Sequence, residues 1–249
     1  MRKAGYEIRI QTMRAILKRC HITKEIVLLL DFINAFNRNL LLLLTAAHVP
    51  ELTKLVVWLY KNESDLMTST GDVVTSLTGT QQGCALSSPL FARIIGYLNS
   101  RLKKEGLTTK LWYMDDGALH RTPESVAWAA RAIGTLGNKT GLRLNWAKCS
   151  VHCCSSSQAE ICRNLFPKSV RIHNTLDVVW LNVPMGTDIY VKKHLAEKLT
   201  HINEVIDMVS NMPHKIEATA LLRSCMTVQN YAYYAHCFSR TIDTIYHCL

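Results

Sequence analysis

The chain has 249 residues, 48% of them hydrophobic and 19% charged, which is the composition of a globular protein with a sizeable core. Its 29 lysines and arginines against 19 acidic residues give a net charge of +10, which favours a polyanionic partner such as nucleic acid over ordinary basic solubility. Nine cysteines, an odd number scattered along the chain, argue against a disulfide framework and for a reducing compartment.

The sequence carries no sign of secretion or membrane insertion. The N-terminus lacks the uninterrupted apolar region of a secretory signal. The leucine-rich runs at 28–30 and 40–44 fall short of the roughly 18 consecutive apolar residues that a membrane span requires. We therefore expect an intracellular protein without membrane association, in the nucleus or cytoplasm rather than in the mitochondrion.

The first elements are predicted to be a helix and a buried strand. Residues 2–19 have the apolar spacing of a helix, and Arg14 and Lys18 share a face that is either solvated or follows a phosphate backbone. The run from Glu25 to Leu30 is almost continuously apolar, as in a buried central strand, and it ends in Asp31. Asp31 either caps the next helix or belongs to a site at the strand end.

The middle of the chain is predicted to contain helices and one hairpin. Helices are expected over 37–47, 51–60 and 87–104, with Pro50 separating the first two. Residues 65–78 are expected to form a hairpin that turns at Gly71-Asp72, followed by a glycine-flanked loop over 79–83.

Two adjacent acids, Asp115 and Asp116, lie between short apolar runs. The alternation of these runs predicts two strands, and the turn-forming pair Asp116-Gly117 predicts that both acids lie at the tip of the hairpin. A solvated Asp-Asp turn is the plain alternative, although Trp112 in the flank favours a buried hairpin.

The strand that ends at Asp31 and the hairpin that carries Asp115 and Asp116 each present acids at a strand end. Adjacent carboxylates repel each other unless a cation offsets their charge. Mg²⁺ prefers carboxylate oxygens, and two such ions on one carboxylate cluster serve in-line phosphoryl transfer. These acids therefore predict a site for Mg²⁺ or Mn²⁺.

The last third of the chain is predicted to be mainly helical. Helices are expected over 123–139, 190–210 and 214–236, and a strand over 177–183. The densest cysteines are expected to be free thiols rather than structural zinc ligands, because no Cys-x-x-Cys pair occurs. They are Cys149, Cys153, Cys154 and Cys162.

Five stretches, in this order, resemble the sequence blocks of one family. They are Asp31-Phe32-Ile33-Asn34-Ala35-Phe36-Asn37, Gly79-Thr80-Gln81-Gln82-Gly83 with Ser88-Pro89-Leu90-Phe91 behind it, Tyr113-Met114-Asp115-Asp116, Gly141-Leu142-Arg143-Leu144-Asn145-Trp146-Ala147-Lys148-Cys149 and Leu181-Asn182-Val183-Pro184-Met185-Gly186. The Tyr-x-Asp-Asp block resembles that of reverse transcriptases, and the first block is similar to that of their non-LTR retrotransposon branch. The resemblance covers about residues 9 to 240.

The resemblance implies an α+β fold, a polymerase palm with an antiparallel sheet backed by helices, plus a helical partial thumb. The palm is expected over residues 1–187 and the thumb over residues 188–249. Only 30 residues precede Asp31, whereas the family's fingers normally lie upstream of that point. We therefore expect a chain truncated to palm and partial thumb, which extends a primer weakly or not at all on its own.

The resemblance also implies roles for single residues. Asp31, Asp115 and Asp116 are expected to be catalytic and to hold the metal ions, while Lys148 neutralises the leaving pyrophosphate. The nucleotide is expected to contact Phe32, Phe36, Gln82 and Gly83, with Phe36 excluding a 2′-hydroxyl. The primer end is expected to contact Tyr113, Met114, Met185 and Gly186.

The implied activity is that of an RNA-directed DNA polymerase, which transfers a nucleotide from dNTP to the primer 3′-hydroxyl. The expected partners are an RNA template, a DNA primer and dNTP, with a fingers segment or a host ribonucleoprotein as further candidates. One alternative is a catalytically inactive, domesticated protein that keeps the palm fold as a nucleic-acid-binding or ribonucleoprotein scaffold. A weaker alternative is an RNA-templated RNA polymerase.

Overall fold

The structure is a computed structural model that describes residues 5–33, 50–60, 64–67, 70–76, 85–104, 110–139 and 142–221. It contains two compact units, Cys20–Thr175 and Met1–Arg19 with Leu176–Leu249, which we describe one at a time. The predicted helix over 37–47, the loop over 79–83 and the end of the helix over 214–236 lie outside the described residues. The division into a palm over 1–187 and a thumb over 188–249 stays a prediction.

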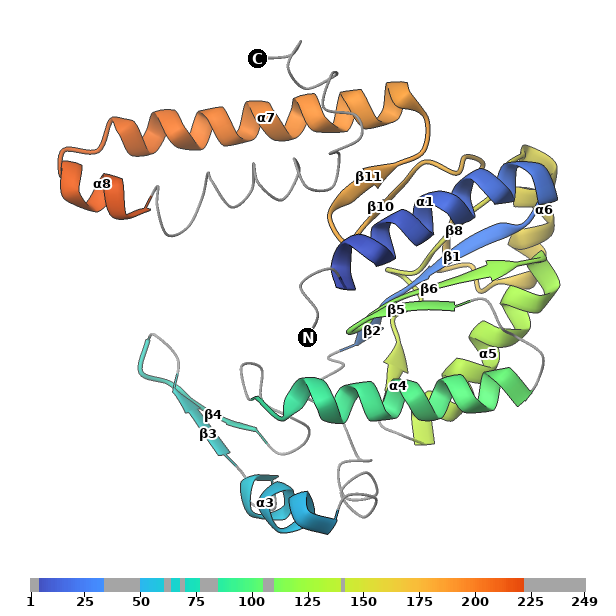
Figure 1. The fold of residues 1–249 in the computed structure, drawn as a ribbon, viewed down its shortest axis with the longest axis horizontal. Coiled ribbons are helices and arrows are strands. Elements are labelled where there is room, and N and C mark those ends of the chain that lie inside the picture. The colour runs from blue at the N-terminus through green and yellow to red at the C-terminus, as the bar shows by residue number, and fades with distance from the viewer. Residues whose placement is uncertain are drawn as a thin grey trace. The chain divides into compact units, whose positions relative to one another are not determined.

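The larger unit is built on a five-stranded sheet (Figure 1). In spatial order its strands are β5 (Lys110–Tyr113), β6 (Asp116–Arg121), β1 (Ile26–Leu30), β8 (Ser150–His152) and β9 (Arg171–His173). Neighbouring strands run antiparallel, except for the parallel pair β8–β9 at one edge. The α+β fold class is therefore confirmed, and the expected antiparallel sheet carries one parallel pair.

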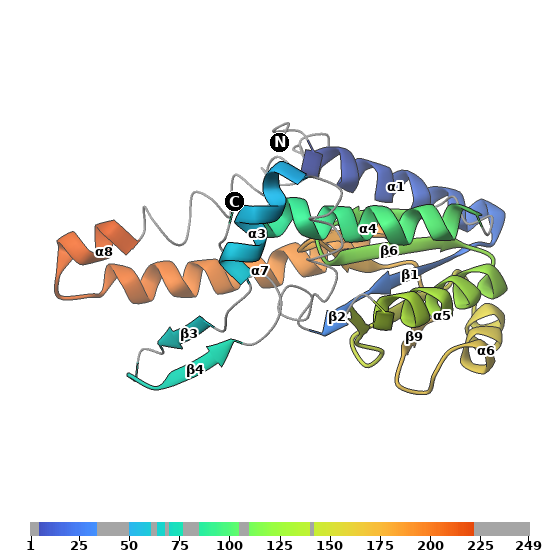
Figure 2. The same ribbon diagram turned by 90° about the horizontal axis from the view of Figure 1, so that it is seen from below.

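One face of this sheet forms the main core. Leu28 in β1 pairs with Leu119 of β6 and Val151 of β8, and all three side chains are fully buried. Because side chains alternate along a strand, Ile26 and Leu30 point to the same face. Three helices cover this face, as Figures 1 and 2 show, and their inward side chains belong to the same core cluster. They are α4 (Ser87–Lys104), α5 (Pro123–Lys139) and α6 (Ser156–Leu165).

The helices predicted over 87–104 and 123–139 are confirmed with the same bounds, because each has a regular apolar stripe and a proline in its first turn. Shorter elements complete the larger unit. They are β2 (Phe32–Ile33) with β7 (Arg143–Leu144), β3 (Ser64–Met67) with β4 (Val73–Ser76), and α3 (Pro50–Tyr60). The β3–β4 hairpin confirms the one predicted over 65–78, and Gly71 adopts a φ of 87° in its turn, which glycine tolerates.

The smaller unit contains most of α1 and a hairpin that leads into two further helices. Its elements are α1 (Gly5–Thr23), β10 (Val178–Trp180), β11 (Val183–Met185), α7 (Asp188–Ser210) and α8 (Lys215–Leu221). The helices predicted over 2–19 and 190–210 are thus confirmed. None of the described helices combines the length and the apolar character that crossing a membrane demands.

The strand predicted over 177–183 is confirmed only as far as Trp180, because Val183 begins the next strand and the chain reverses at Leu181-Asn182. Both residues have positive φ, 52° and 60°, as in the type I′ turn of two-residue hairpins. Leucine rarely adopts a positive φ, so the sequence does not predict a turn here. The Tyr6 hydroxyl donates a hydrogen bond of 2.6 Å to the Leu181 carbonyl, which ties the turn to α1.

Met185 is the last residue of β11, and the chain bends directly after it at Gly186. Gly186 follows with a φ of 136°, and a Cβ there would lie 2.1 Å from Asp177 Oδ1. The same oxygen accepts a hydrogen bond of 2.7 Å from the backbone N–H of Thr187, the N-cap residue of α7. Glycine at this position therefore lets Asp177 reach the start of α7.

We expect Gly186→Ala to lower the free energy of unfolding by about 1–3 kcal/mol, because the new methyl group displaces the Asp177 carboxylate. Urea denaturation followed by circular dichroism measures this loss. The matched control is Gly96→Ala in α4, where an added Cβ meets no atom within 4 Å and should raise stability by about 0.5–1 kcal/mol. Unchanged stability of Gly186→Ala would show that Asp177 does not depend on this glycine.

Candidate active site

The strand pairing brings the three predicted acids to one end of the sheet. Leu30 of β1 pairs with Gly117 of β6, and the next step of the antiparallel register sets Asp31 opposite Asp116. On the other side of β6, Asp116 pairs with Tyr113 of β5, and Asp115 lies in the two-residue loop between these strands. Acids that are up to 85 positions apart in the chain are therefore placed together by three paired strands.

The tip of the hairpin is Met114-Asp115, so the turn predicted at Asp116-Gly117 is wrong. Met114 has a positive φ of 53° and Asp115 does not, which is the pattern of a type II′ turn. Gly117 lies in β6 opposite Trp112, where a Cβ would be 2.4 Å from the indole Cζ3. Gly117 is needed because the Trp112 ring lies against its Cα, and not because the chain turns there. A single sequence does not distinguish these two reasons for a glycine.

Trp112 fixes the hairpin to the rest of the unit. Its ring stacks on Phe32 with a centroid distance of 6.1 Å, and its Nε1–H donates to Asn99 Oδ1 of α4 at 2.8 Å. The carbonyl of Asn99 accepts a second bond, of 2.8 Å, from the Lys110 ammonium group. Burial and the charge of Lys103 lower the pKa of Lys110. Asn99 was not predicted, because an asparagine in a helix carries no sign of its distant partners.

The backbone of Asp31 is held from the opposite side. Its carbonyl accepts hydrogen bonds from the N–H of Asn145 at 2.9 Å and from the Cys149 thiol at 3.9 Å. Because the Asn145 bond belongs to a hydrogen-bonded pair, the next pair, Phe32 with Leu144, is a non-hydrogen-bonded one. The Phe32 carbonyl therefore points away from β7, while the Phe32 side chain, 7% exposed, belongs to the core.

The surroundings of the three carboxylates favour a bound cation. Asp31 Oδ1 is buried and accepts no hydrogen bond from the residues that the structure describes. Partial burial, then the charge of Asp115, then the charge of Asp31 raise the pKa of Asp116 to about 6. A buried carboxylate oxygen without a donor, beside two further carboxylates, fits a divalent ion with oxygen ligands such as Mg²⁺.

Lys148 lies in the turn that holds Asp31. The Lys148 N–H donates to the carbonyl of Asn145 at 2.9 Å, and Arg171 Nη2 donates to the carbonyl of Lys148 at 3.1 Å. The Lys148 side chain itself is exposed. The structure therefore connects the predicted lysine to the acids through the Asn145 backbone.

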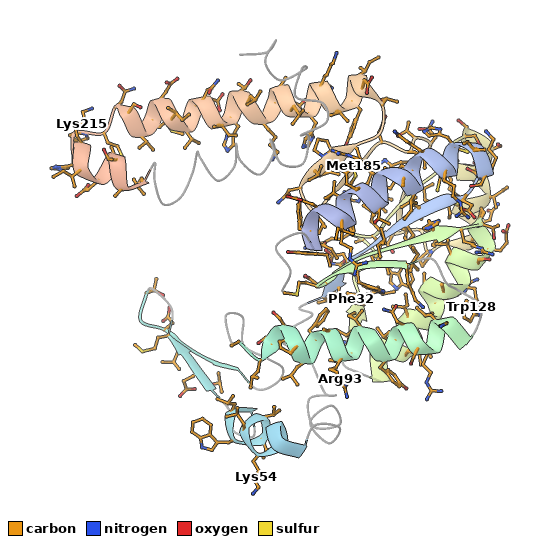
Figure 3. The ribbon with its side chains drawn as sticks, in the orientation of Figure 1. Phe32, Lys54, Arg93, Trp128, Met185 and Lys215 are labelled. Carbon is orange, nitrogen blue, oxygen red and sulfur yellow. The ribbon has the colours of Figure 1, made fainter. Side chains whose placement is uncertain are left out.

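The remaining predicted residues fall into three groups. Tyr113 and Met114 are half-buried on the hairpin beside the acids. Met185, labelled in Figure 3 with Phe32, is 2% exposed and, like Gly186, belongs to the smaller unit. The others lie outside the described residues. They are Phe36, Gln82 and Gly83.

The cysteine group of the last third is not arranged as a zinc site within the described residues. The four thiols are unbridged, as expected. Cys153 donates a hydrogen bond of 3.6 Å to Cys162, and this bond together with burial raises the pKa of Cys153. The neighbouring His152 ring stacks on His173 with a centroid distance of 4.7 Å.

Comparison with known proteins adds one finding. A family model described as "Reverse transcriptase (RNA-dependent DNA polymerase)" matches residues 6–186. This match spans all three acids and the elements that hold them. No curated protein matches the chain.

The contact between Trp112 and Gly117 can be tested by a double-mutant cycle. Gly117→Ala should lower the free energy of unfolding by about 1–3 kcal/mol, because the ring is held by Phe32 and Asn99 and cannot move freely. Trp112→Leu should also destabilise, but the double variant should lose less than the sum, with a coupling of about 0.5–3 kcal/mol. Purely additive losses in urea denaturation would show that the ring and the glycine do not meet.

The raised pKa of Asp116 predicts how stability depends on pH in the metal-free protein. The folded state binds the proton more tightly than the unfolded state, so stability falls as pH rises from about 4 to about 6. Asp116→Asn should remove this fall, and its melting temperature in chelator should exceed that of the wild type at pH 7.5 but not at pH 4. The control Asp207→Asn, an exposed carboxylate on α7, should follow the wild type at both pH values. A stability gain at pH 4 as large as at pH 7.5 would contradict the assignment.

Proposed function

This chain belongs to the reverse transcriptase family, whose model matches residues 6–186, and from this membership we propose that it is an RNA-directed DNA polymerase of non-LTR retrotransposon type. The observation that carries the proposal is the meeting of Asp31, Asp115 and Asp116 at one end of the sheet, with Asp31 Oδ1 buried and without a donor among the described residues. The type within the family rests on the resemblance of the Asp31–Asn37 stretch.

The proposed metal ligands are Asp31 and Asp115, with the Phe32 carbonyl as an auxiliary ligand and Asp116 as a charge partner. When bound there, Mg²⁺ or Mn²⁺ supplies charge neutralisation at the reacting phosphate and lowers the pKa of the attacking hydroxyl. The Phe32 carbonyl suits this role because it points away from the β7 ladder.

The protein contributes fixed positions for these ligands. The backbone of Asp31 is held by Asn145, and the turn of Asp115 is held through Trp112, so the backbone that carries each carboxylate is fixed before substrate binds. Positions fixed before binding are the main contribution that an enzyme makes to phosphoryl transfer. The exposed Lys148 ammonium group would neutralise charge on the pyrophosphate that leaves.

The substrate contacts are proposed residue by residue. Phe36, Gln82 and Gly83 would line the nucleotide site, with Phe36 selecting deoxyribonucleotides. Tyr113 and Met114 would contact the primer end from the hairpin. Met185 is buried, so the primer contact proposed for Met185 and Gly186 would use their backbone.

An RNA template and a DNA primer are the proposed macromolecular partners, with dNTP as the second substrate. The net charge of +10 supports a polyanion as partner. Phosphate contacts of this kind release counterions, so primer–template binding should weaken steeply as salt is raised.

The proposal is tested by primer extension on an RNA template with labelled dNTP and Mg²⁺. We expect weak template-directed extension or none by the chain alone and stronger extension when a fingers segment is supplied. With that segment present, Asp31→Asn should lose more than about a thousandfold, because an oriented ligand contributes several kcal/mol at about 1.36 kcal/mol per tenfold change in rate. The matched control is Glu160→Gln, an exposed carboxylate on α6, which should extend like the wild type.

Two outcomes would redirect the proposal. Extension that survives Asp31→Asn would refute the assignment of the acids. Salt-dependent binding of the primer–template without any extension, even when a fingers segment is supplied, would favour a catalytically inactive ribonucleoprotein scaffold that retains the fold.

A further inference from the structure

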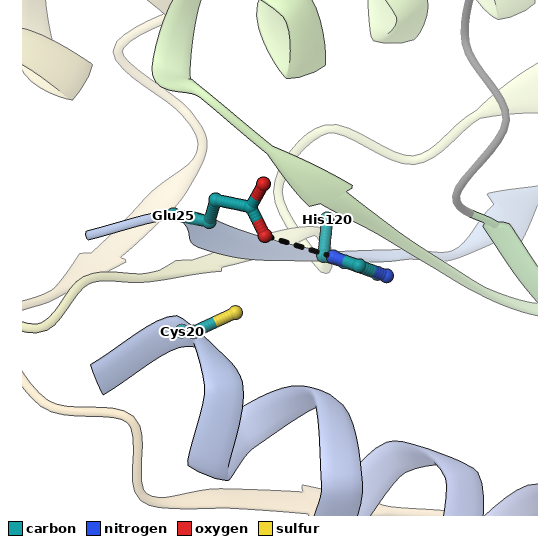
Figure 4. A group of neighbouring side chains, drawn as sticks. All are labelled: Cys20, Glu25 and His120. Atoms are coloured by element: carbon teal, nitrogen blue, oxygen red, sulfur yellow. Dashed lines mark hydrogen bonds and ion pairs between the residues drawn. The ribbon is translucent and has the colours of Figure 1, made fainter. Parts of the chain in front are cut away.

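A second group of metal-binding side chains lies in the larger unit, apart from the three acids. Cys20, Glu25 and His120 each offer one ligand atom, and these atoms lie within 4.8 Å of one another (Figure 4). All three side chains are buried, with 0%, 8% and 5% of each residue exposed. We propose that they form a zinc site that fastens the last turn of α1 to the central sheet.

Backbone geometry places the three ligands. Val27 of β1 pairs with His120 of β6, and Glu25, two residues earlier, shares the face of Val27, so the carboxylate and the imidazole lie on one side of the sheet. This is the face opposite to the core of Leu28 and Leu119. His120 therefore occupies a position that would be expected to carry an apolar residue if only packing mattered.

The turn between α1 and β1 brings the thiol to the same place. α1 ends at Thr23, and Lys24 adopts a positive φ of 55°, a conformation that a non-glycine residue takes at a cost. The Lys24 carbonyl accepts a hydrogen bond from the Gln158 side chain of α6. With the turn held in this way, Cys20 in the last helical turn points toward Glu25 and His120 (Figure 4).

The donor atoms select the metal. A thiolate, an imidazole nitrogen and a carboxylate oxygen are the three ligand types of Zn²⁺, and a mixed set of this kind suits its borderline softness. Three protein ligands leave a fourth tetrahedral position for water. Mg²⁺, which prefers oxygen ligands, is the wrong ion for this set.

One contact within the group, a long hydrogen bond and ion pair in the structure, also has the spacing of two zinc ligands. His120 Nδ1 and Glu25 Oε2 are 3.4 Å apart. This separation is longer than the donor–acceptor distance of most N–H···O hydrogen bonds, which is roughly 2.7–3.2 Å. It equals the separation of about 3.4 Å between two ligands that each lie about 2.1 Å from a tetrahedral zinc ion. The pair is thus spaced as two corners of a zinc tetrahedron.

The site is separate from the proposed catalytic acids. His120 lies four residues along β6 from Asp116, and Glu25 lies six residues before Asp31, so the two groups occupy opposite ends of the same strands. At about 3.4 Å per residue, four residues of strand span about 14 Å. The inference does not depend on polymerase activity.

The experiment uses the full chain, freed of metal with a chelator and then titrated with Zn²⁺ or Co²⁺. We expect one tightly bound zinc per chain by elemental analysis after gel filtration. We also expect a thiolate-to-cobalt charge-transfer band with Co²⁺, because Cys20 is a ligand. Cys20→Ser should abolish the band and weaken zinc binding by about a hundredfold or more. Loss of a residue that only contacts a ligand would weaken binding by roughly 10- to 100-fold.

Two controls assign the site. Cys154→Ser removes a thiol outside the group and should keep both the band and the bound zinc. Asp31→Asn should keep them as well, because the acids are separate. Glu25→Gln and His120→Gln should each weaken zinc binding.

The wild-type cobalt spectrum decides the matter even if Cys20→Ser fails to fold, which circular dichroism would reveal. A folded wild type without a thiolate band, or one that loses its zinc on gel filtration, would overturn the proposal. Loss of the band in Cys154→Ser, or its survival in folded Cys20→Ser, would overturn it equally.

Discussion

The antiparallel register between β1 and β6 is the constraint on which the larger unit depends. It sets Leu28 against Leu119 in the core and Asp31 beside Asp116 at one end of the strands. At the other end it brings Glu25 close to His120. A slip of one residue would turn the side chains of the shifted strand to the opposite face and take its core leucines away from the helices that cover them. The core therefore enforces the geometry of both polar groups, because its apolar burial is lost in any other register.

The two faces of the sheet differ in the side chains that they carry. One face is closed by α4, α5 and α6 and contains the main core cluster. On the face of Val27, the strand pairing places His120 of β6, His152 of β8 and His173 of β9 in one row across the sheet. Burying imidazoles and a carboxylate on a sheet is unfavourable unless they have partners. Stability comes mostly from the first face, and the second face retains groups that packing alone would not select.

The elements with regular apolar spacing were predictable, and the turns were not. A continuous apolar run predicted the strand β1, and apolar residues at helical spacing predicted the helices α4 and α5. The meeting of the acids was predictable because each acid lies at a strand end or directly beside one. Gly117 misled because glycine serves both turns and close ring contacts, and Leu181 misled because leucine rarely accepts a positive φ. The Cys20 group was not predictable, since its members are up to 100 residues apart and only the fold joins them.

One residue of α4 makes two bonds to one strand, and this has a consequence for motion. Asn99 receives the Trp112 indole through its side chain and the Lys110 ammonium through its carbonyl, so β5 cannot leave the sheet without releasing α4. We therefore expect helix and hairpin to open as one cooperative unit, with amide protons that exchange with solvent together rather than turn by turn. The loop that carries Asp115 lies at the end of that unit, so its fluctuations are damped by a helix in a different part of the sequence.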